Sequence, residues 1–199
     1  MDINSEISAD DPALAGLPVG NVRDGEFDDS EFLNIPDVPI FAEHETVAGN
    51  GRQIRFAHPQ LEAVANRNNQ RITETGDFPA LVLGHTPSPE ERALGREMPE
   101  VVGFAGPFKI GKIGRPGTRQ RFAILADFHV FKQDADKVRK HPRRSPELWL
   151  EEKYEDMFLD PIALLGAEAP RLDLGLLYTK QGESGVTIEK YTASMASAG

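Results

Sequence analysis

The chain has 199 residues, a net charge of −10 and no cysteine. A chain of this length can bury one sizeable hydrophobic core, and without cysteine it forms no disulfide, no thiolate zinc site and no cysteine nucleophile. No apolar run approaches the roughly 18–20 residues of a membrane span, and the acidic N-terminus is unlike a signal peptide. We therefore expect a soluble protein made in the cytoplasm, with no membrane partner.

The negative charge is concentrated at the N-terminal end of the chain. Residues 1–45 hold 12 acidic residues and one basic residue, whereas the rest of the chain holds 20 acidic and 21 basic residues and is nearly neutral. An acidic stretch that is rich in Asp, Gly and Pro and poor in aromatics rarely folds alone, and a small, polar C-terminal stretch is typical of a flexible end. The sequence predicts a flexible acidic segment at 1–34, a folded domain at 35–179 and a flexible tail at 180–199.

Strands and helices alternate along the predicted domain. Apolar residues at helical spacing indicate amphipathic helices, and continuous or alternating apolar runs indicate strands. The expected elements, in chain order, are strand 38–45, helix 58–71, strand 78–85, helix 89–96, the two arms 100–114 and 121–131 of a bent hairpin, helices 134–141 and 146–158, and strands 161–169 and 172–178. This pattern predicts an α+β fold, a mostly antiparallel β-sheet or barrel surrounded by several helices.

The tripeptide Ser-Pro-Glu occurs twice, beginning at Ser88 and at Ser145. Both copies suit the start of a helix, because Ser is a favoured N-cap, Pro fits the first helical position and an acid in the first turn interacts well with the helix dipole. Ser88 has Glu91 three residues later, which completes a capping box, whereas Ser145 has Leu148 there. The second copy is therefore either a plain helix start or the site of a serine nucleophile.

Catalysis through a serine needs a base within hydrogen-bond reach. His85 follows Gly84 at the end of the most apolar predicted strand, where an exposed imidazole at the edge of the core would suit a general base. The alternative is a strand-end histidine that is simply exposed to solvent.

A cluster of basic residues lies between the hairpin and the second Ser-Pro-Glu. Its members are Lys137, Arg139, Lys140, Arg143 and Arg144. The cluster lacks interleaved aromatic residues and the whole chain is acidic, so we expect no nucleic-acid partner.

The order and intervals of these motifs resemble the phage prohead (capsid maturation) serine proteases of the Mu-like branch, which share the herpesvirus assemblin fold. The matching stretches are Gly84-His85, Val102-Gly103, Ser145-Pro146-Glu147 and the run from Asp160 to Pro170. The resemblance covers roughly residues 38–178. No single motif is specific, whereas their order and spacing are more so.

The resemblance implies a role for three residues. Ser145 would be the nucleophile and His85 the general base, within or near hydrogen-bond reach on neighbouring strands. The third member varies in this family between His and an acid, and Asp160 is the best match by position. The alternatives that stay open for this role are Glu168, Asp127 and His129.

The resemblance also implies a reaction and its setting. An assemblin-like serine protease needs no metal and no cofactor, and its substrates would be the phage scaffold and major capsid protein precursors, packed with it inside an immature prohead in the host cytoplasm. Whether the chain forms homo-oligomers stays open. Because Pro146 has no N–H, the backbone donor just after the nucleophile is missing, and other backbone N–H groups or Arg171 would have to hold an oxyanion.

Other classes of function compete with a protease. The strongest is a non-enzymatic phage structural or scaffold-associated protein that keeps this fold with an idle Ser and His. A metal-dependent hydrolase would use His85, Asp127 and His129, but these lack a clear further ligand. The glycine-rich stretch 111–118 lacks the spacing of a phosphate-binding loop, and we interpret it as a hairpin tip.

Overall fold

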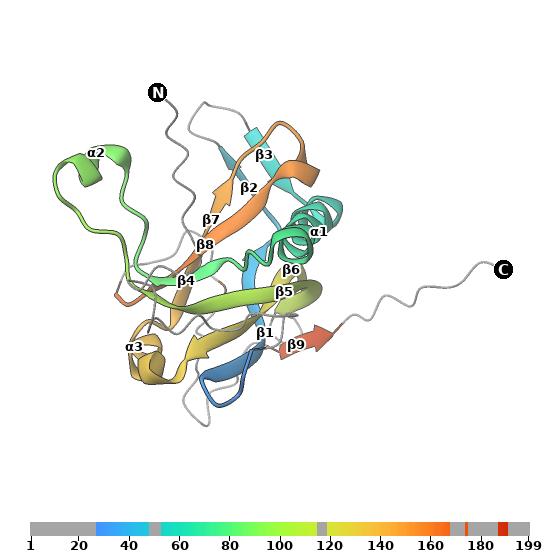
Figure 1. Cartoon of the computed structure of the whole chain (residues 1–199). Helices are drawn as coiled ribbons and strands as arrows, with labels where there is room; N and C mark the ends of the chain where they lie inside the picture. The colour runs from blue at the N-terminus through green and yellow to red at the C-terminus, as the bar shows by residue number, and fades with distance from the viewer. Residues whose placement is uncertain (1–26, 48–52, 115–118, 168–173, 175–186, 191–199) are drawn as a thin grey trace.

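The computed structural model describes residues 27–47, 53–114, 119–167, 174 and 187–190. It shows an α+β fold with a mixed, mostly antiparallel sheet (Figure 1), as predicted, whose strands follow the order β1-β6-β5-β4-β8-β7. The sheet is not closed into a barrel, which corrects one part of the prediction. Its strands are β1 (Phe32–Ala42), β4 (Ala80–Leu83), β5 (Val101–Gly114), β6 (Arg121–Phe131), β7 (Arg143–Trp149) and β8 (Phe158–Leu165).

Two smaller strand pairings and three α-helices complete the described structure. β9 (Thr187–Lys190) pairs with the second half of β5, and β2 (His44–Val47) forms a separate hairpin with β3 (Gln53–Phe56). The helices are α1 (His58–Thr75), α2 (Pro89–Ala93) and α3 (Ala135–Lys140), with short 3-10 turns at Lys132–Asp134 and Tyr154–Asp156. No helix in the described part of the chain is long and apolar enough to span a bilayer.

The β5–β6 hairpin forms where the long apolar arms predict it. The two strands approach so closely at Gly103 that an added Cβ would lie 2.2 Å from the carbonyl oxygen of His129. The glycine of the Val102-Gly103 motif is therefore required for strand packing in this fold. Its presence is explained without any role in catalysis.

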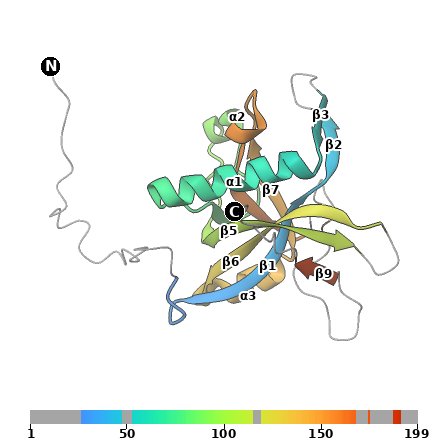
Figure 2. The ribbon, with the colours of Figure 1, turned by 90° about the vertical axis from the view of Figure 1, so that its right-hand side faces the viewer.

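Helix α1 fills a gap in the sheet that the short strand β4 leaves open. β4 pairs with β5 only as far as Phe104 and with β8 only from Ile162 onward. Beyond these limits, Asn69 of α1 is bonded to both backbone groups of Phe108 on β5, and Asn68 is bonded to both backbone groups of Leu159 on β8. The helix thus packs across β5, β6 and β8 on one face of the sheet (Figure 2).

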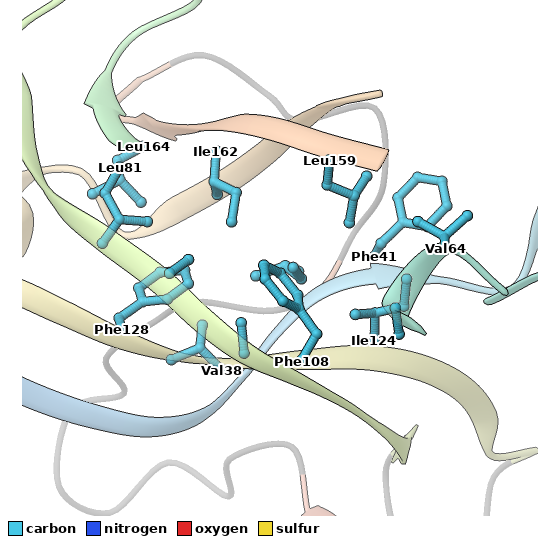
Figure 3. Close-up of a cluster of buried hydrophobic side chains, with 14 of the residues drawn as sticks. Val38, Phe41, Val64, Leu81, Phe108, Ile124, Phe128, Leu159, Ile162 and Leu164 are labelled. Atoms are coloured by element: carbon cyan, nitrogen blue, oxygen red, sulfur yellow. The ribbon is translucent and has the colours of Figure 1, made fainter. Parts of the chain in front are cut away.

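The main hydrophobic core lies between this face of the sheet and α1 (Figure 3). Successive strand residues point to opposite faces, so Leu81, Ile162 and Leu164 enter this core. Val82 and Ala163 form a small cluster with Leu165 on the other face. This second cluster is the surface on which Ser145 is found.

Three expectations about individual elements need correction, and a fourth falls almost wholly outside the described residues. The strand expected at 38–45 begins earlier, at Phe32, and is interrupted at Glu43, after which β2 follows. Residues 27–34, expected in the flexible segment, are ordered, and β9 lies within the expected flexible tail. The helix expected at 146–158 is absent. Residues 143–149 form β7, and between β7 and β8 the chain forms only a 3-10 turn. The strand expected at 172–178 lies outside the described residues, except for the buried Leu174.

The wrong prediction at 146–158 has a physical cause. A Ser-Pro-Glu sequence suits an extended chain as well as a helix start, because Pro restricts the preceding residue to extended conformations. Pro146 of β7 lies opposite Ile162 of β8, and β7 is the last strand in the order of the sheet. An edge strand tolerates proline because one row of its N–H groups pairs with no neighbouring strand. Pairing with the apolar strand β8 therefore overrides the local helix signals.

Candidate active site

The two Ser-Pro-Glu tripeptides adopt different structures. Ser88 is the N-cap of α2: its Oγ accepts a hydrogen bond from the Glu91 N–H at 3.2 Å, and the Glu91 carboxylate accepts one from the Ser88 N–H at 2.8 Å. This is the predicted capping box, and it is confirmed. Helix α2 stands away from the sheet, on the connection between β4 and β5 (Figure 1).

Ser145 is not a helix cap. It lies within β7 opposite Ala163 of β8, and Ala163 in turn lies beside Val82 of β4. The residue is only 8% exposed. Within the described part of the chain, its hydroxyl group has no hydrogen-bond partner, so it is available to a base or a substrate.

His85 lies just beyond β4, where the chain leaves the sheet. Gly84 makes this turn possible, since its φ of 89° lies in the left-handed region and its N–H still donates to the Leu164 carbonyl of β8 at 3.0 Å. The His85 side chain is 44% exposed, and its Nδ1 lies 3.5 Å from Oε1 of Glu147. The imidazole is thus held at the edge of the sheet beside a carboxylate.

Glu147 connects the strand of Ser145 with the segment of His85. The same oxygen that contacts His85, Oε1, accepts a hydrogen bond from the Thr86 N–H at 2.8 Å. A backbone donor to a carboxylate makes a strong, charge-assisted bond. Glu147 therefore joins β7, the strand of Ser145, to the turn that follows β4 and carries His85.

His85 and Ser145 do not lie on neighbouring strands, contrary to expectation. β8 lies between β4 and β7, so the backbones of β4 and β7 are two strand spacings apart, roughly 9.5 Å. Among the described contacts there is no hydrogen bond between the two side chains. The gap between the serine and the base would have to close when a substrate binds.

Asp160, the expected third member, does not lie beside His85. Its Oδ1 accepts a hydrogen bond from the N–H of Ala80, the first residue of β4, at 3.3 Å, whereas His85 follows the last residue of that strand. Arg71 Nη2 lies 3.9 Å from its other oxygen. Burial raises the pKa of the Asp160 carboxyl group, and the Ala80 N–H and the charge of Arg71 oppose this. No described contact joins Asp160 to His85.

The alternative third members are engaged in other contacts or lie outside the described residues. Asp127 accepts hydrogen bonds from the Asp37 N–H and from Lys109 Nζ. Both ring nitrogens of His129 lie within hydrogen-bond distance of oxygens, those of the Asn34 side chain and the Gly106 carbonyl, and burial lowers the pKa of this imidazole. Glu168 and Arg171, the latter considered for the oxyanion, lie outside the described residues.

The metal-hydrolase alternative finds no support in the geometry. Within the described ranges, no three His, Asp or Glu side chains are grouped so that they could hold a metal ion. The structure therefore does not bring His85 together with Asp127 and His129. Of the glycine-rich stretch 111–118, residues 111–114 belong to β5, and the remainder lies outside the described residues.

Glu147 is the residue of this candidate site that the sequence pattern does not indicate. In a helix it would be a first-turn acid, whereas in β7 it lies at a shift of the pairing register and its carboxylate reaches the turn after β4. One member of the basic cluster is not on the surface: Arg144 is only 2% exposed and donates to the carbonyls of Pro39, Pro142 and Leu174.

Comparison of the chain with protein-family models, with curated proteins and with solved structures found no match.

Proposed function

We propose that the protein is a serine endopeptidase with an assemblin-like fold, which processes phage scaffold and major capsid protein precursors during prohead maturation. The observation that carries this proposal is the contact between His85 and Glu147, a residue of the strand that carries Ser145. Ser145 and Glu147 are two residues apart on β7, and His85, from the other side of β8, contacts the Glu147 carboxylate at 3.5 Å. A hydroxyl, an imidazole and a carboxylate are the groups of a Ser-His-acid triad.

The proposed reaction is acyl transfer followed by hydrolysis. The Ser145 Oγ attacks the scissile carbonyl carbon while His85 accepts the hydroxyl proton, and the imidazolium then gives this proton to the leaving amine as the C–N bond breaks. Water, activated in the same way, releases the acyl group. The serine and the imidazole must approach one another in the substrate complex, as catalytic groups that are loosely placed without substrate commonly do.

The position of Ser145 suits a polypeptide substrate. β7 is the last strand in the order of the sheet. β1 approaches it at Arg144, and an extended substrate could add to the rest of this edge through backbone hydrogen bonds. This binding mode would place a peptide bond beside the nucleophile without demanding one particular side chain. Because Pro146 supplies no N–H, the oxyanion must be held by other N–H groups.

Co-expression with the scaffold and major capsid precursors of the same phage tests the proposal. Ser145→Ala and His85→Ala should each abolish cleavage of the precursors while the protein remains folded. Ser88→Ala is the matched control, since it removes the other Ser-Pro-Glu serine and should cost only its cap, about 0.5–2 kcal/mol of stability, with cleavage retained. If Ser145→Ala and Ser88→Ala process the precursors equally well, Ser145 is not the nucleophile.

A second candidate function is that of a non-enzymatic phage structural or scaffold-associated protein. The observation in its favour is that Ser145 is buried, with 8% of the residue exposed, and that its hydroxyl has no described bond to His85. A fluorophosphonate probe separates the two functions, because it labels only an activated serine. Labelling of Ser145 that is lost in His85→Ala supports the protease; no labelling, together with retained assembly of capsids by Ser145→Ala, supports the structural protein.

A further inference from the structure

We infer that Glu147, and not Asp160, is the residue that positions the His85 imidazole, holding Nδ1 so that Nε2 is the ring nitrogen available to Ser145. This inference rests on the proposed function for its catalytic meaning. Its geometric content, a carboxylate that sets the tautomer and orientation of His85, can be tested without any activity.

The first support is the way in which one oxygen of Glu147 is shared. Oε1 lies 2.8 Å from the Thr86 N and 3.5 Å from the His85 Nδ1, so it contacts two successive residues of the same turn. The backbone bond fixes the carboxylate against the segment that carries the imidazole. Nδ1 is the ring nitrogen that lies beside this oxygen, so the negative charge favours a proton on Nδ1 and leaves the lone pair of a neutral ring on Nε2.

The second support is the local structure of β7. The pairing register with β8 shifts between Pro146 and Leu148, so Glu147 lies at an irregularity of the strand. Such irregularities re-aim side chains and recur next to active sites. The same short stretch of β7 thus presents the nucleophile at Ser145 and, two residues later, a carboxylate directed to the turn after β4.

The third support is the placement of Asp160. Its Oδ1 is bonded to the Ala80 N–H, at the opposite end of β4 from His85, and Arg71 approaches its Oδ2. The Glu147 side chain is 30% exposed and contacts the imidazole, whereas Asp160 makes no described contact with it. Glu147 is therefore the carboxylate that can stabilise a positive charge on His85.

The role follows the proton through the reaction. When the Ser145 Oγ forms its bond to the carbonyl carbon, its proton passes to Nε2 of His85. The ring, which already carries a proton on Nδ1, becomes an imidazolium. The ionised Glu147 stabilises this cation and remains ionised itself. The proton on Nε2 then leaves with the amine, and the imidazole returns to its starting form.

Nitrogen-15 NMR of the histidine side chains in the full-length protein tests the positioning directly. Glu147→Gln should reduce the population of the His85 tautomer protonated on Nδ1, because it removes the carboxylate that lies beside this nitrogen. Asp160→Asn should leave this population unchanged. Glu62→Gln is the matched control, since Glu62 lies 3.4 Å from Nε2 of His58 and its loss should affect His58 alone.

Kinetics of precursor cleavage supply the second readout. Glu147→Gln should lower kcat by about 10²-fold or more with little change in KM, since a wrong tautomer disables the base without removing a substrate contact. Glu147→Asp, which keeps the charge on a shorter side chain, should recover part of the rate. If Glu147→Gln does not fold, Glu147→Asp carries the NMR test, with a smaller change of the same sign.

The outcomes separate the positioning role from the proposed activity. A tautomer population of His85 that responds to Asp160→Asn and not to Glu147→Gln overturns the role of Glu147, whether or not the protein cleaves precursors. A response to Glu147→Gln in a protein that neither cleaves precursors nor labels at Ser145 leaves the positioning intact and overturns the proposed protease.

Discussion

The buried side chain of Asn68 is bonded in both directions to the backbone of Leu159: its Nδ2 donates to the carbonyl oxygen at 2.9 Å, and its Oδ1 accepts from the N–H at 3.0 Å. Helix α1 is thereby fixed to the start of β8, the strand that separates His85 from Ser145. The next residue, Asn69, makes the equivalent pair of bonds to Phe108 of β5, both at 2.8 Å. These two asparagines replace the strand pairing that β4 is too short to provide.

Replacing Asn68 by Ala should destabilise the protein strongly. The change leaves the N–H and carbonyl groups of Leu159 without partners in a site where Asn68 is 1% exposed, and unsatisfied buried groups cost about 1–3 kcal/mol each. We expect a loss of about 2–4 kcal/mol in urea denaturation. Asn66→Ala is the matched control, because Asn66 is exposed on the same helix and should change stability little. Equal effects of the two variants would contradict the structural role of Asn68.

Replacing Arg144 by Met should destabilise the protein, because Arg144 connects β7 with β1 at the two edges of the sheet. The guanidinium of Arg144 donates from β7 to the Pro39 carbonyl of β1 and to the Leu174 carbonyl, at 2.9 and 3.0 Å. The apolar replacement removes these donors from buried carbonyls, for an expected loss of about 2–4 kcal/mol. The control is Arg139→Met, whose side chain is 67% exposed and whose ion pair with Asp136 should contribute little. Thermal denaturation compares the two, and a loss no larger for Arg144 than for Arg139 would be inconsistent with the bonds described.

The carboxyl group of Asp160 should make stability depend on pH. Burial raises its pKa above the usual value of 3.8, so the folded protein holds this proton more tightly than the unfolded chain. Stability is therefore lost as the pH rises from about 4 through the folded pKa, and the loss persists at neutral pH. Asp160→Asn removes this ionisation, so it should gain stability over the wild type as the pH rises from about 3 to about 7. Urea denaturation across this range measures the difference, and a difference that shrinks with rising pH would show the opposite shift.

The beginning of the described chain should contribute to stability, contrary to the expectation for residues 1–34. The Phe27 ring lies flat against the His129 imidazole, with centroids 3.8 Å apart, and contacts Phe32 edge-on. Removing residues 1–34 should lower Tm more than removing residues 1–26, because only the longer deletion takes away Phe27 and the first residues of β1. Phe27→Ala, which we expect to cost about 1–3 kcal/mol, tests the ring alone. Equal melting temperatures for the two deletions would show that the ring contacts add nothing.

Where neighbouring residues supply both partners of an interaction, the sequence alone was sufficient. The capping box at the start of α2 needs only Ser88 and Glu91, three residues apart, and it forms as predicted. The β5–β6 hairpin and α1 follow from apolar patterns within single stretches of the chain. In the candidate site, Ser145 and His85 each stand in a short motif of their own, and their roles stay predictions.

Local patterns did not decide what those groups contact. Ser145-Pro146-Glu147 satisfies the rules for a helix start, and only pairing with β8 makes it a strand and turns Glu147 toward the residues after β4. Arg144 belongs to a basic stretch, but its side chain is buried and donates to the carbonyls of Pro39 and Leu174, which are distant in the sequence. Asp160 precedes the apolar run that follows it in the sequence, as the expected third member should. The fold places its carboxylate beside the Ala80 N–H and not beside His85. A short sequence determines the backbone conformations open to it, whereas contacts between distant segments, which form only when the whole core assembles, determine which one is stable.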